Sequence, residues 1–451
     1  MSSNPRAFTV TLKSVLAIAV PMTLAHITTP LIGITDTAVV GQLGSAALLG
    51  AVALGALLFD FIGTALNCLR MGTTGLVAQA MGAGDTEAEA LTLWRALVIA
   101  LIAGVLIIAL QGPMAALFLV SMGASEAVNE ATRDYFNVRV WGMPLMLANY
   151  AILGWLLGLG RAATGLALQI LLSVVNIAGS IALVLWFELG VAGVAAASVL
   201  AEAVALLFGA AVVWRARLPR PQRARVLEPT GLKRMLSVNR DIFIRSVLLM
   251  AVVAVFASAG ARLGDLTLAA NAVLLNLFLV SAYFLDGLAT AAEQLGGRAV
   301  GARHRPAFDR TLSLALQAGV LVSAALAATA FALQTPFVAL MTTSEDVRAV
   351  ALTYLPWAAL TPLAGMIAFV MDGVFIGATW TVTMRNMMIA SSAIFVAVWW
   401  ALSPYLGNHG LWLAFNVYLL ARGLTLWAFV PRLATRTFPA AAAGRAITQP
   451  R

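Results

Sequence analysis

The chain has 451 residues, of which 61% are hydrophobic and only 10% carry a charge, and its mean hydropathy is +0.94. Soluble globular proteins have about 25% charged residues, so this composition excludes a soluble domain and predicts an integral membrane protein. The formal net charge is +9. Because its basic residues cluster in short polar connections, where anionic lipid is the nearest partner, we expect membrane lipid and no nucleic acid as a partner.

About twelve apolar stretches are each long enough to cross a bilayer of roughly 30 Å. They predict an all-α membrane protein with helices, in chain order, over residues 14–40, 46–70, 91–111, 135–159, 164–187, 190–214, 242–262, 268–296, 312–333, 350–376, 384–402 and 411–430. The first residues lack the apolar core and small-residue site of a removable leader, so we expect the first span to be retained.

The longest polar stretch follows the sixth span and divides the chain into two halves. By the positive-inside rule its basic residues predict a cytoplasmic connection, and an even number of spans then places both termini in the cytoplasm. These residues are Arg215, Arg217, Arg220, Arg223, Arg225, Lys233, Arg234 and Arg240. The predicted units are an amino-terminal six-helix lobe over residues 1–214, a basic linker over 215–240, a carboxyl-terminal six-helix lobe over 241–434 and a polar tail over 435–451.

An internal repeat relates the two halves at a shift of about 219 residues. The matched pairs include Gly82 with Gly301, Tyr135 with Tyr354, Gly154 with Gly373 and Gly158 with Gly377. Six spans per copy give both copies the same orientation, so the lobes are pseudo-symmetric about an axis along the membrane normal, and transporters commonly bind substrate between such copies. Chance recurrence of small residues is the alternative interpretation.

One carboxylate, Asp36, lies in the apolar helical stretch Leu31–Gly41. An ionised Asp inside a bilayer costs about 3 kcal/mol on insertion scales, so such a residue faces water, has a partner or holds a proton. Pro21 and Pro30 precede it in the same span and allow the helix to bend. This combination favours transport over a scaffold role.

Five short motifs distributed over both halves are Asp36–Gly41, Leu69–Gly75, Leu285–Gly287, Met371–Ala378 and Met384–Asn386. Together they resemble the multidrug and toxic compound extrusion (MATE) transporters, specifically their DNA-damage-inducible subgroup. The resemblance implies a twelve-helix antiporter whose two six-helix lobes surround a central cavity. It also implies export of amphipathic compounds in exchange for protons or sodium.

The resemblance implies that Asp36 couples ion movement and that Asn176 lies with it in the amino-terminal lobe. This chain departs from the family pattern at Ser180, where many members carry Asp, and Ser198 stands where several carry Thr. Hard cations are held by several oxygens that include carboxylates, so the missing acid favours protons over sodium. Sodium remains the alternative coupling ion, and we expect no other cofactor and no metal.

Further polar residues fall inside the amino-terminal spans. Glu202 follows Ser198 by four residues on the same helical face. Two nearby carboxylates in a low dielectric cannot both ionise cheaply, so our hypothesis is that Asp36 and Glu202 share or relay a proton. A purely structural Glu202 is the alternative. Asp60 and Tyr135 are candidates for the substrate cavity or for a polar network.

In the carboxyl-terminal lobe, Asp286 and Asp372 fall in the inner halves of their spans, and Arg422 lies near the middle of the last span. An unpaired Arg at that depth is costly, so we expect it to bond to Asp286 or Asp372. Such a network either holds the lobe rigid or receives a cationic substrate. We expect Arg70 to snorkel to the inner surface and Glu293 to be solvated there.

The prediction is secondary active efflux of a small amphipathic compound by alternating access, coupled to inward proton movement, by a monomer in the inner membrane. A flippase for a lipid-linked precursor is the second interpretation, but the cavity dense in arginines that it needs is not visible. An enzyme is not expected, because His26, His304 and His409 are scattered, Cys68 is the only cysteine and no nucleotide-binding P-loop is present.

Overall fold

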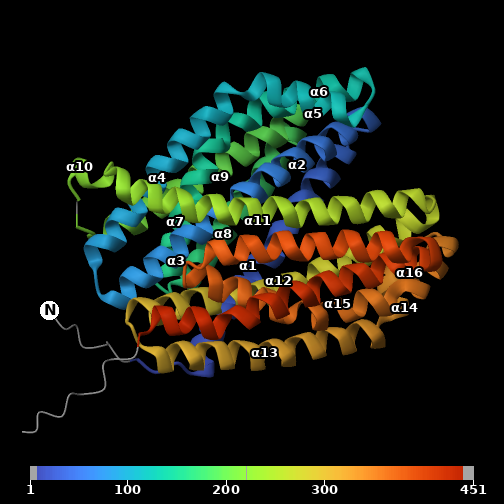
Figure 1. The fold of residues 1–451 in the computed structure, drawn as a ribbon. Coiled ribbons are helices and arrows are strands. Elements are labelled where there is room, and N and C mark those ends of the chain that lie inside the picture. Colours follow the sequence, from blue (N-terminus) through green and yellow to red (C-terminus); the bar gives the residue numbers. More distant parts are fainter. Residues whose placement is uncertain (1–7, 220, 440–451) are drawn as a thin grey trace, which may run out of the picture.

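The computed structural model describes residues 8–219 and 221–439, which form a bundle of long helices (Figure 1). The amino-terminal half contains α1 (Leu12–Gly41), α2 (Ala46–Leu66), α3 (Cys68–Ala83), α4 (Thr86–Ala109), α5 (Gln111–Met122), α6 (Glu126–Arg139), η1 (Val140–Gly142), α7 (Met143–Gly158), α8 (Ala162–Ile181), η2 (Ala182–Trp186) and α9 (Gly190–Arg215). Helices α2 and α3 together make one span, and so do α6, η1 and α7.

The carboxyl-terminal half contains α10 (Arg223–Val226), α11 (Pro229–Arg262), α12 (Asp265–Gly301), α13 (Arg305–Ala332), α14 (Gln334–Met341), α15 (Glu345–Gly377) and α16 (Thr381–Thr437). Gly407 interrupts α16 with a φ of 50° and a ψ of −124°, so this element is two helices in sequence. Within the described residues, 11 helices are long and apolar enough to span a membrane, and the break in α16 raises the number of spans to twelve. The prediction of an all-helical protein with twelve spans is confirmed.

Several helices extend beyond the apolar stretches that predicted them. Helix α11 begins at Pro229, inside the predicted linker over residues 215–240, and α16 ends at Thr437, inside the predicted tail. Hydropathy detects the part of a helix that fits the hydrocarbon, whereas the helix itself continues through polar residues beyond it. Parts of the predicted first segment, linker and tail lie outside the described residues, namely residues 1–7, Arg220 and residues 440–451.

The connections between spans lie at two opposite ends of the bundle. One end, at the left of Figure 1, holds the connections at residues 84–85, 216–219, 221–228, 302–304 and 378–380. We call it the basic end because Arg217, Arg223, Arg225 and Arg303 lie there. The other end, which we call the far end, holds the connections at residues 42–45, 123–125, 187–189, 263–264 and 342–344 and the break at Gly407.

Helix α1 packs against both halves of the molecule. Its first part contributes Val15 and Ile18 to the apolar core of the carboxyl-terminal half. Its last part contributes Val39 and Val40 to the core of the amino-terminal half. The two prolines of α1, Pro21 and Pro30, lie between these packing regions. A change in the relative position of the two halves therefore bends α1 in the segment that the prolines weaken.

Close helix contacts repeat in the two halves. Gly154 of α7 lies against the carbonyl of Arg70 in α3, and Gly373 of α15 lies against the carbonyl of Ala289 in α12, with no room for a methyl group at either glycine. The members of these two contacts differ by the same shift of about 219 residues that relates the halves in sequence. The recurrence is therefore a recurrence of packing and not only of composition.

The two halves meet along α3 and α12 at the basic end. Gly82 lies against the carbonyl of Arg298, and Gly301 lies against the carbonyl of Gln79, a pair of contacts that the repeat relates to each other. The Gln79 side chain also donates to the Gly377 carbonyl at 2.8 Å. We call this contact region the seam. Among the described residues, the hydrogen bonds that Gln79 and Gln294 make between the two lobes lie at this seam.

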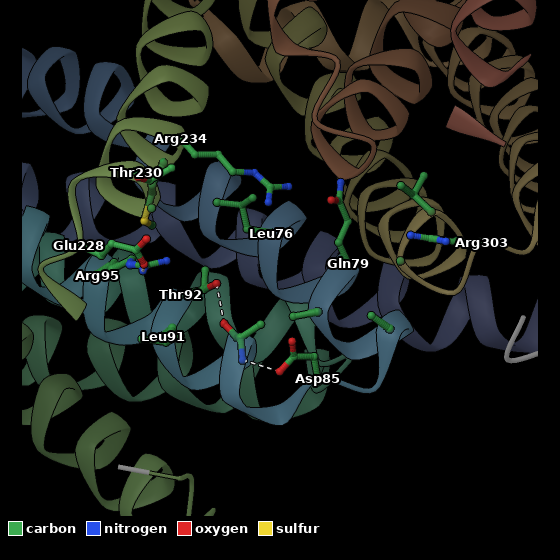
Figure 2. A pocket seen from close by; sticks show the side chains of 17 residues that line it. Leu76, Gln79, Asp85, Leu91, Thr92, Arg95, Glu228, Thr230, Arg234 and Arg303 are labelled. Carbon is green, nitrogen blue, oxygen red and sulfur yellow. Dashed lines mark hydrogen bonds and ion pairs between the residues drawn. The ribbon is translucent and has the colours of Figure 1, made fainter. Parts of the chain in front are cut away.

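The linker between the halves is fastened to α4. Arg95 donates to the carbonyls of Arg225 at 2.7 Å and Val226 at 3.2 Å, and it pairs with Glu228 at 3.4 Å. Arg225 pairs in turn with Glu87. A cavity of about 640 Å³ lies beside these contacts, between α3, α4, the start of α11 and the end of α12 (Figure 2). The linker thus connects the two halves at the same end as the seam.

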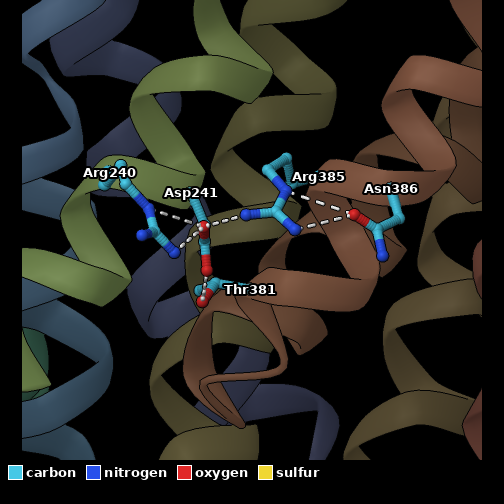
Figure 3. Close-up of polar contacts among 5 residues, drawn as sticks. All are labelled: Arg240, Asp241, Thr381, Arg385 and Asn386. Atoms are coloured by element: carbon cyan, nitrogen blue, oxygen red, sulfur yellow. Dashed lines mark hydrogen bonds and ion pairs between the residues drawn. The ribbon is translucent and has the colours of Figure 1, made fainter.

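A second polar cluster at the basic end ties α11 to α16. Asp241 is fully buried and accepts hydrogen bonds from Arg385 at 2.8 Å, Arg240 at 3.0 Å and Thr381 at 3.2 Å. Figure 3 shows the two guanidinium groups approaching this carboxylate from opposite sides. Its charge is compensated inside the carboxyl-terminal half, so we assign the cluster a structural role.

Candidate ion-coupling site and polar networks

Asp36 is buried where α1 meets α8. Its side chain is 6% exposed, and its Oδ1 accepts a hydrogen bond of 2.6 Å from the Ser180 hydroxyl. No cation of the described residues comes within 4.0 Å of this carboxylate. Directly after Ser180, α8 gives way to the π-helical turn η2 (Ala182–Trp186), a local widening that is frequent at functional sites. Asp36 is thus a shielded acid that has a hydroxyl donor and lacks a salt bridge.

The other two residues implied by the family resemblance lie next to each other. The Asn176 amide donates to the Ser198 hydroxyl at 2.9 Å, which joins α8 to α9. Asn176 precedes Ser180 by one helical turn, so both point from the same face of α8. The amide oxygen of Asn176 is buried and has no hydrogen-bond partner among the described residues. It is therefore free to accept a proton donor or to coordinate a cation.

Glu202 has its own set of partners. Its Oε2 accepts a 2.6 Å hydrogen bond from Asn149, and its Oε1 lies 3.9 Å from the Arg139 guanidinium. No hydrogen bond joins Asp36 to Glu202, so the hypothesis that they share a proton stays a prediction. The structure instead puts an arginine in electrostatic reach of both acids.

Arg139, at the end of α6, is the residue of this network that sequence analysis missed. It interacts electrostatically with Asp36, Asp60 and Glu202, and its guanidinium lies 5.3 Å from the centre of the Phe59 ring. One of its nitrogens is buried without a partner. The signal in the sequence is a lone arginine five positions into the span predicted from residue 135, because a charge inside a span needs a partner whether it is basic or acidic.

Asp60 and Tyr135 occupy different environments in the same lobe. Asp60 is exposed, and it interacts electrostatically with Tyr283 of α12 in the opposite half. Asp60 therefore fits the predicted role of a cavity residue. Tyr135 is only 3% exposed, its ring packs edge-on against Phe59 at 6.1 Å, and it interacts with Arg139. It belongs to the polar network and not to an open surface.

The carboxyl-terminal lobe holds one acid between two arginines. Asp372 of α15 pairs with Arg422 of α16 and with Arg245 of α11 through the same carboxylate oxygen. All three side chains are less than 10% exposed, and Arg422 also lies 5.6 Å from the centre of the Phe369 ring. The prediction that Arg422 pairs with a carboxylate is confirmed for Asp372. The second arginine, Arg245, was not anticipated, because it lies close to the predicted start of its span.

Asp286, the other predicted partner of Arg422, makes no ion pair within 4.0 Å among the described residues. It interacts electrostatically with His26 of α1, and the His26 ring stacks on Tyr283 with centroids 6.3 Å apart. Asp286 also interacts electrostatically with Arg245 and Arg422, so it lies between the halves at the edge of the arginine cluster, without an ion pair to it. Among the described residues, no three His, Cys, Asp or Glu side chains come together as a metal site.

Two predicted positions were wrong. Arg70 does not snorkel to the surface, since it is 5% exposed and donates to Asn67 Oδ1 at 2.8 Å. Glu293 is not solvated, since it is 2% exposed. Both errors have the same cause. Each residue lies near the end of its own span, where a charged side chain normally reaches water. Here α3 and α12 pack against each other at the seam and cover both side chains.

The geometry matches a known family of membrane proteins. The family model MatE matches residues 21–182 and 242–402, which is one copy in each half of the chain. The chain belongs to the MatE family. Because members of this family are transporters, the prediction of a MATE transporter and not an enzyme is confirmed.

Individual MATE relatives cover almost the whole chain. The DNA damage-inducible protein F of Escherichia coli (strain K12) is 39% identical over 419 residues, which cover 92% of this chain and 91% of that protein. Protein DETOXIFICATION 44, chloroplastic, of Arabidopsis thaliana is 26% identical over 446 residues, which cover 94% of this chain and 82% of that protein. The predicted likeness to the DNA-damage-inducible subgroup is thereby confirmed.

Solved MATE structures share the fold. A MATE crystal structure in the bent conformation has a TM-score of 0.86 and 20% identity, over 94% of this chain and 96% of that one. An outward-facing multidrug resistance MATE family transporter has a TM-score of 0.84 and 22% identity, over the same shares of the two chains. At this level of identity the match shows the fold of this MATE protein and leaves its cargo and ion open.

Proposed function

We propose that this MATE transporter exports small amphipathic compounds by alternating access in exchange for protons, and that Asp36 is the proton-binding residue. The single observation that carries this proposal is the state of Asp36, a buried acid with one hydroxyl donor and no cation in ion-pair range. A charge in that position costs free energy that protonation removes. Protonation can then alter the bend of α1, the helix that packs against both halves.

Protons are favoured over sodium by the oxygen atoms around Asp36. A sodium site needs several oxygen ligands, and carboxylates usually supply part of the charge. Here Asp36 accepts a hydrogen bond from the Ser180 hydroxyl, and the other polar residues that the resemblance brings to the site, Asn176 and Ser198, are bonded to each other. One carboxylate with neutral hydrogen-bond partners and an arginine in electrostatic reach suits a proton better than a metal cation.

The orientation follows from charge. We propose that the basic end faces the cytoplasm of the cell, with both termini on that side of the inner membrane, because basic connections are retained inside. With the basic end in the cytoplasm, the closed seam at this end supports an outward-facing arrangement. A monomer is sufficient for this mechanism, because both lobes and the seam come from one chain.

The amphipathic cargo is inferred from relatives and from the lobe surfaces. A relative from Caulobacter vibrioides, 28% identical over 307 residues, is named a probable multidrug resistance protein NorM. The exposed Asp60 is an acid that a cationic compound could approach between the lobes. A flippase of lipid-linked precursors would need unpaired arginines for pyrophosphate, and the deep Arg245 and Arg422 are already committed to Asp372.

The test is dye transport in sealed vesicles with pH and sodium gradients imposed one at a time. We expect efflux to follow the pH gradient and to be lost in Asp36→Asn. Asp241→Asn is not a suitable control because its cluster is structural, so Asp309→Asn, at an exposed surface pair, serves as the matched acid-to-amide control. Transport that follows only sodium, or that persists unchanged in Asp36→Asn, would overturn the proposal.

A further inference from the structure

A second buried acid without an ion pair lies at the seam, far along the chain from the Asp36 site. Glu293 of α12 is 2% exposed, and its Oε1 is buried without a hydrogen-bond partner. No Arg, Lys or His of the described residues lies within 4.0 Å of it. Its own carbonyl is covered by Gly377 of α15, which packs there with no room for a side chain.

The groups that face Glu293 come from both halves. The Thr74 hydroxyl of α3 donates a hydrogen bond to the Glu293 carboxylate, Arg70 of α3 interacts with it electrostatically, and Asp286 lies two turns earlier on its own helix. On α1, His26 interacts with Asp286 and Arg70 and has a buried Nε2 without a partner. One buried nitrogen of Arg70 also lacks a partner. Around Glu293 the cluster therefore contains Arg70, Asp286 and His26, with no close ion pair among them, and Arg245 and Asp372 interact with Asp286 from deeper in the carboxyl-terminal lobe.

Glu293 is covered by the contact between the lobes and not by its own lobe alone. The internal repeat matches Thr74 with Glu293 and Ala78 with Gly297. A side-chain carbon at Gly297 would lie only 2.9 Å from the Ala78 methyl group, so these matched positions face each other across the seam. When the basic end opens, as alternating access requires, α3 leaves α12 and water reaches the Glu293 carboxyl.

The Glu293 carboxyl has a higher proton affinity when it is buried in the closed seam than when it is exposed to water. A carboxylate without a paired cation is strongly disfavoured inside the closed seam, whereas water stabilises the ionised form in the open state. We propose that Glu293 is a second proton-binding site, which takes up a proton as the basic end closes and releases it when that end opens. The proposal rests on the alternating-access function above, but it concerns a different residue and a different step.

Thermodynamic linkage gives a direct consequence. A ligand that binds one conformation better shifts the equilibrium toward that conformation, and here the ligand is the proton. Acid conditions should therefore favour the closed basic end, and alkaline conditions should favour the open one. In Glu293→Gln the neutral amide imitates the protonated acid, so the basic end should stay closed at every pH.

The test measures the separation of the lobes at the basic end. Spin labels are attached at Thr86→Cys on α4 and Arg310→Cys on α13, two exposed positions, in a Cys68→Ala background in lipid nanodiscs. When the pH is raised from about 6 to about 9, we expect the distance between the two labels to lengthen in the protein that retains Glu293. In Glu293→Gln, the closed population at about pH 9 should be on the order of tenfold larger than in the protein that retains Glu293, because one pH unit of proton linkage corresponds to a factor of ten.

The opposite sign distinguishes an ion-pair role. If Glu293 were permanently ionised as a counter-ion for Arg70, the amide would leave Arg70 unmatched and the seam would loosen, which would lengthen the distances. That result, or a distance distribution that does not change with pH in the parent protein, overturns the proposal. Glu293→Asp should keep the pH response. Thr74→Val, which removes the hydroxyl that donates to Glu293, should keep the response and move its midpoint to higher pH.

The readout is independent of the Asp36 proposal. Asp36→Asn should abolish proton-driven efflux while it leaves the pH-dependent closure of the labelled protein in place. If efflux follows sodium and the closure still titrates through Glu293, only the proposed coupling ion fails. If closure loses its pH dependence in Asp36→Asn and keeps it in Glu293→Gln, the second site is wrong.

Discussion

The two lobes repeat the same helix contacts, yet Asp372 and Asp36, the acids inside them away from the seam, have different partners. In the carboxyl-terminal lobe Asp372 lies between Arg245 and Arg422, so its charge is fixed by direct ion pairs. In the amino-terminal lobe one arginine, Arg139, interacts electrostatically with several acids, and Asp36 accepts a hydrogen bond from a hydroxyl group. A fold repeated within one chain thus provides one lobe with a locked charge and the other with a charge that can be neutralised.

This difference between Asp372 and Asp36 explains how a symmetric scaffold can move asymmetrically. A buried ion pair resists change because removal of either partner leaves an uncompensated charge. A buried acid without a cation responds to protonation, because the proton removes the cost of its charge. We therefore expect the interior of the amino-terminal lobe to change shape during transport. The ion pairs of Asp372 should keep the interior of the carboxyl-terminal lobe rigid, while Glu293 of that lobe responds at the seam.

The largest effect is expected when the ion pairs of Asp372 are removed. Asp372→Asn leaves two deeply buried arginines without a carboxylate, which should destabilise the protein by about 3–5 kcal/mol. Thermal unfolding in detergent measures this loss. The matched control is Asp60→Asn, at an exposed acid, which should change the stability by less than about 0.5 kcal/mol. Equal melting temperatures for the two variants would show that Asp372 is not locked.

The symmetry of the seam can be tested at its paired glycines. Gly301→Ala and Gly82→Ala each place a methyl group against a carbonyl of the opposite lobe, and overpacking costs about 1–3 kcal/mol. Both should shift the spin-label distances at the basic end toward the open state by similar amounts. Gly33→Ala, where no atom lies within 4 Å of the new carbon, is the control. An effect of only one seam variant would break the equivalence of the lobes.

The proton affinity of the responsive lobe can be changed through the hydrogen bond to Asp36. Ser180→Ala removes the donor at 2.6 Å, and a lost hydrogen bond to the ionised acid favours its protonated form. The pH of half-maximal efflux should therefore rise by about one unit. Ser173→Ala, at a buried serine on the same helix that has no hydrogen bond to an acid of the described residues, should leave the pH profile in place.

The smallest shift is expected from the shared arginine. Arg139→Gln removes a cation that interacts with Asp36 from beyond ion-pair distance, so the pH of half-maximal efflux should rise by roughly half a unit or less. Arg139→Lys keeps the charge and should restore most of the original profile. If the glutamine variant shifts the profile downward instead, Arg139 does not act on Asp36 through its charge.

Much of the candidate site was predictable because a charge in hydrocarbon is rare and costly. Asp36, Glu202, Asp372 and Arg422 were all found by that criterion. Arg139 and Arg245 were missed because they lie near the predicted starts of spans, where an arginine can normally reach water. Their burial depends on neighbouring helices that a single span does not identify.

The sequence by itself determined the membrane environment, the twelve spans, the repeat and the family, because apolar length, small-residue recurrence and short motifs are local properties of the chain. Only the tertiary structure decided which acids have cations beside them and which do not. It buried Arg70 and Glu293 at the seam although each lies near the end of the apolar part of its span. The physical reason is that solvent access and ion pairing depend on distances between segments far apart in sequence, and these distances are set by the packing of the two lobes.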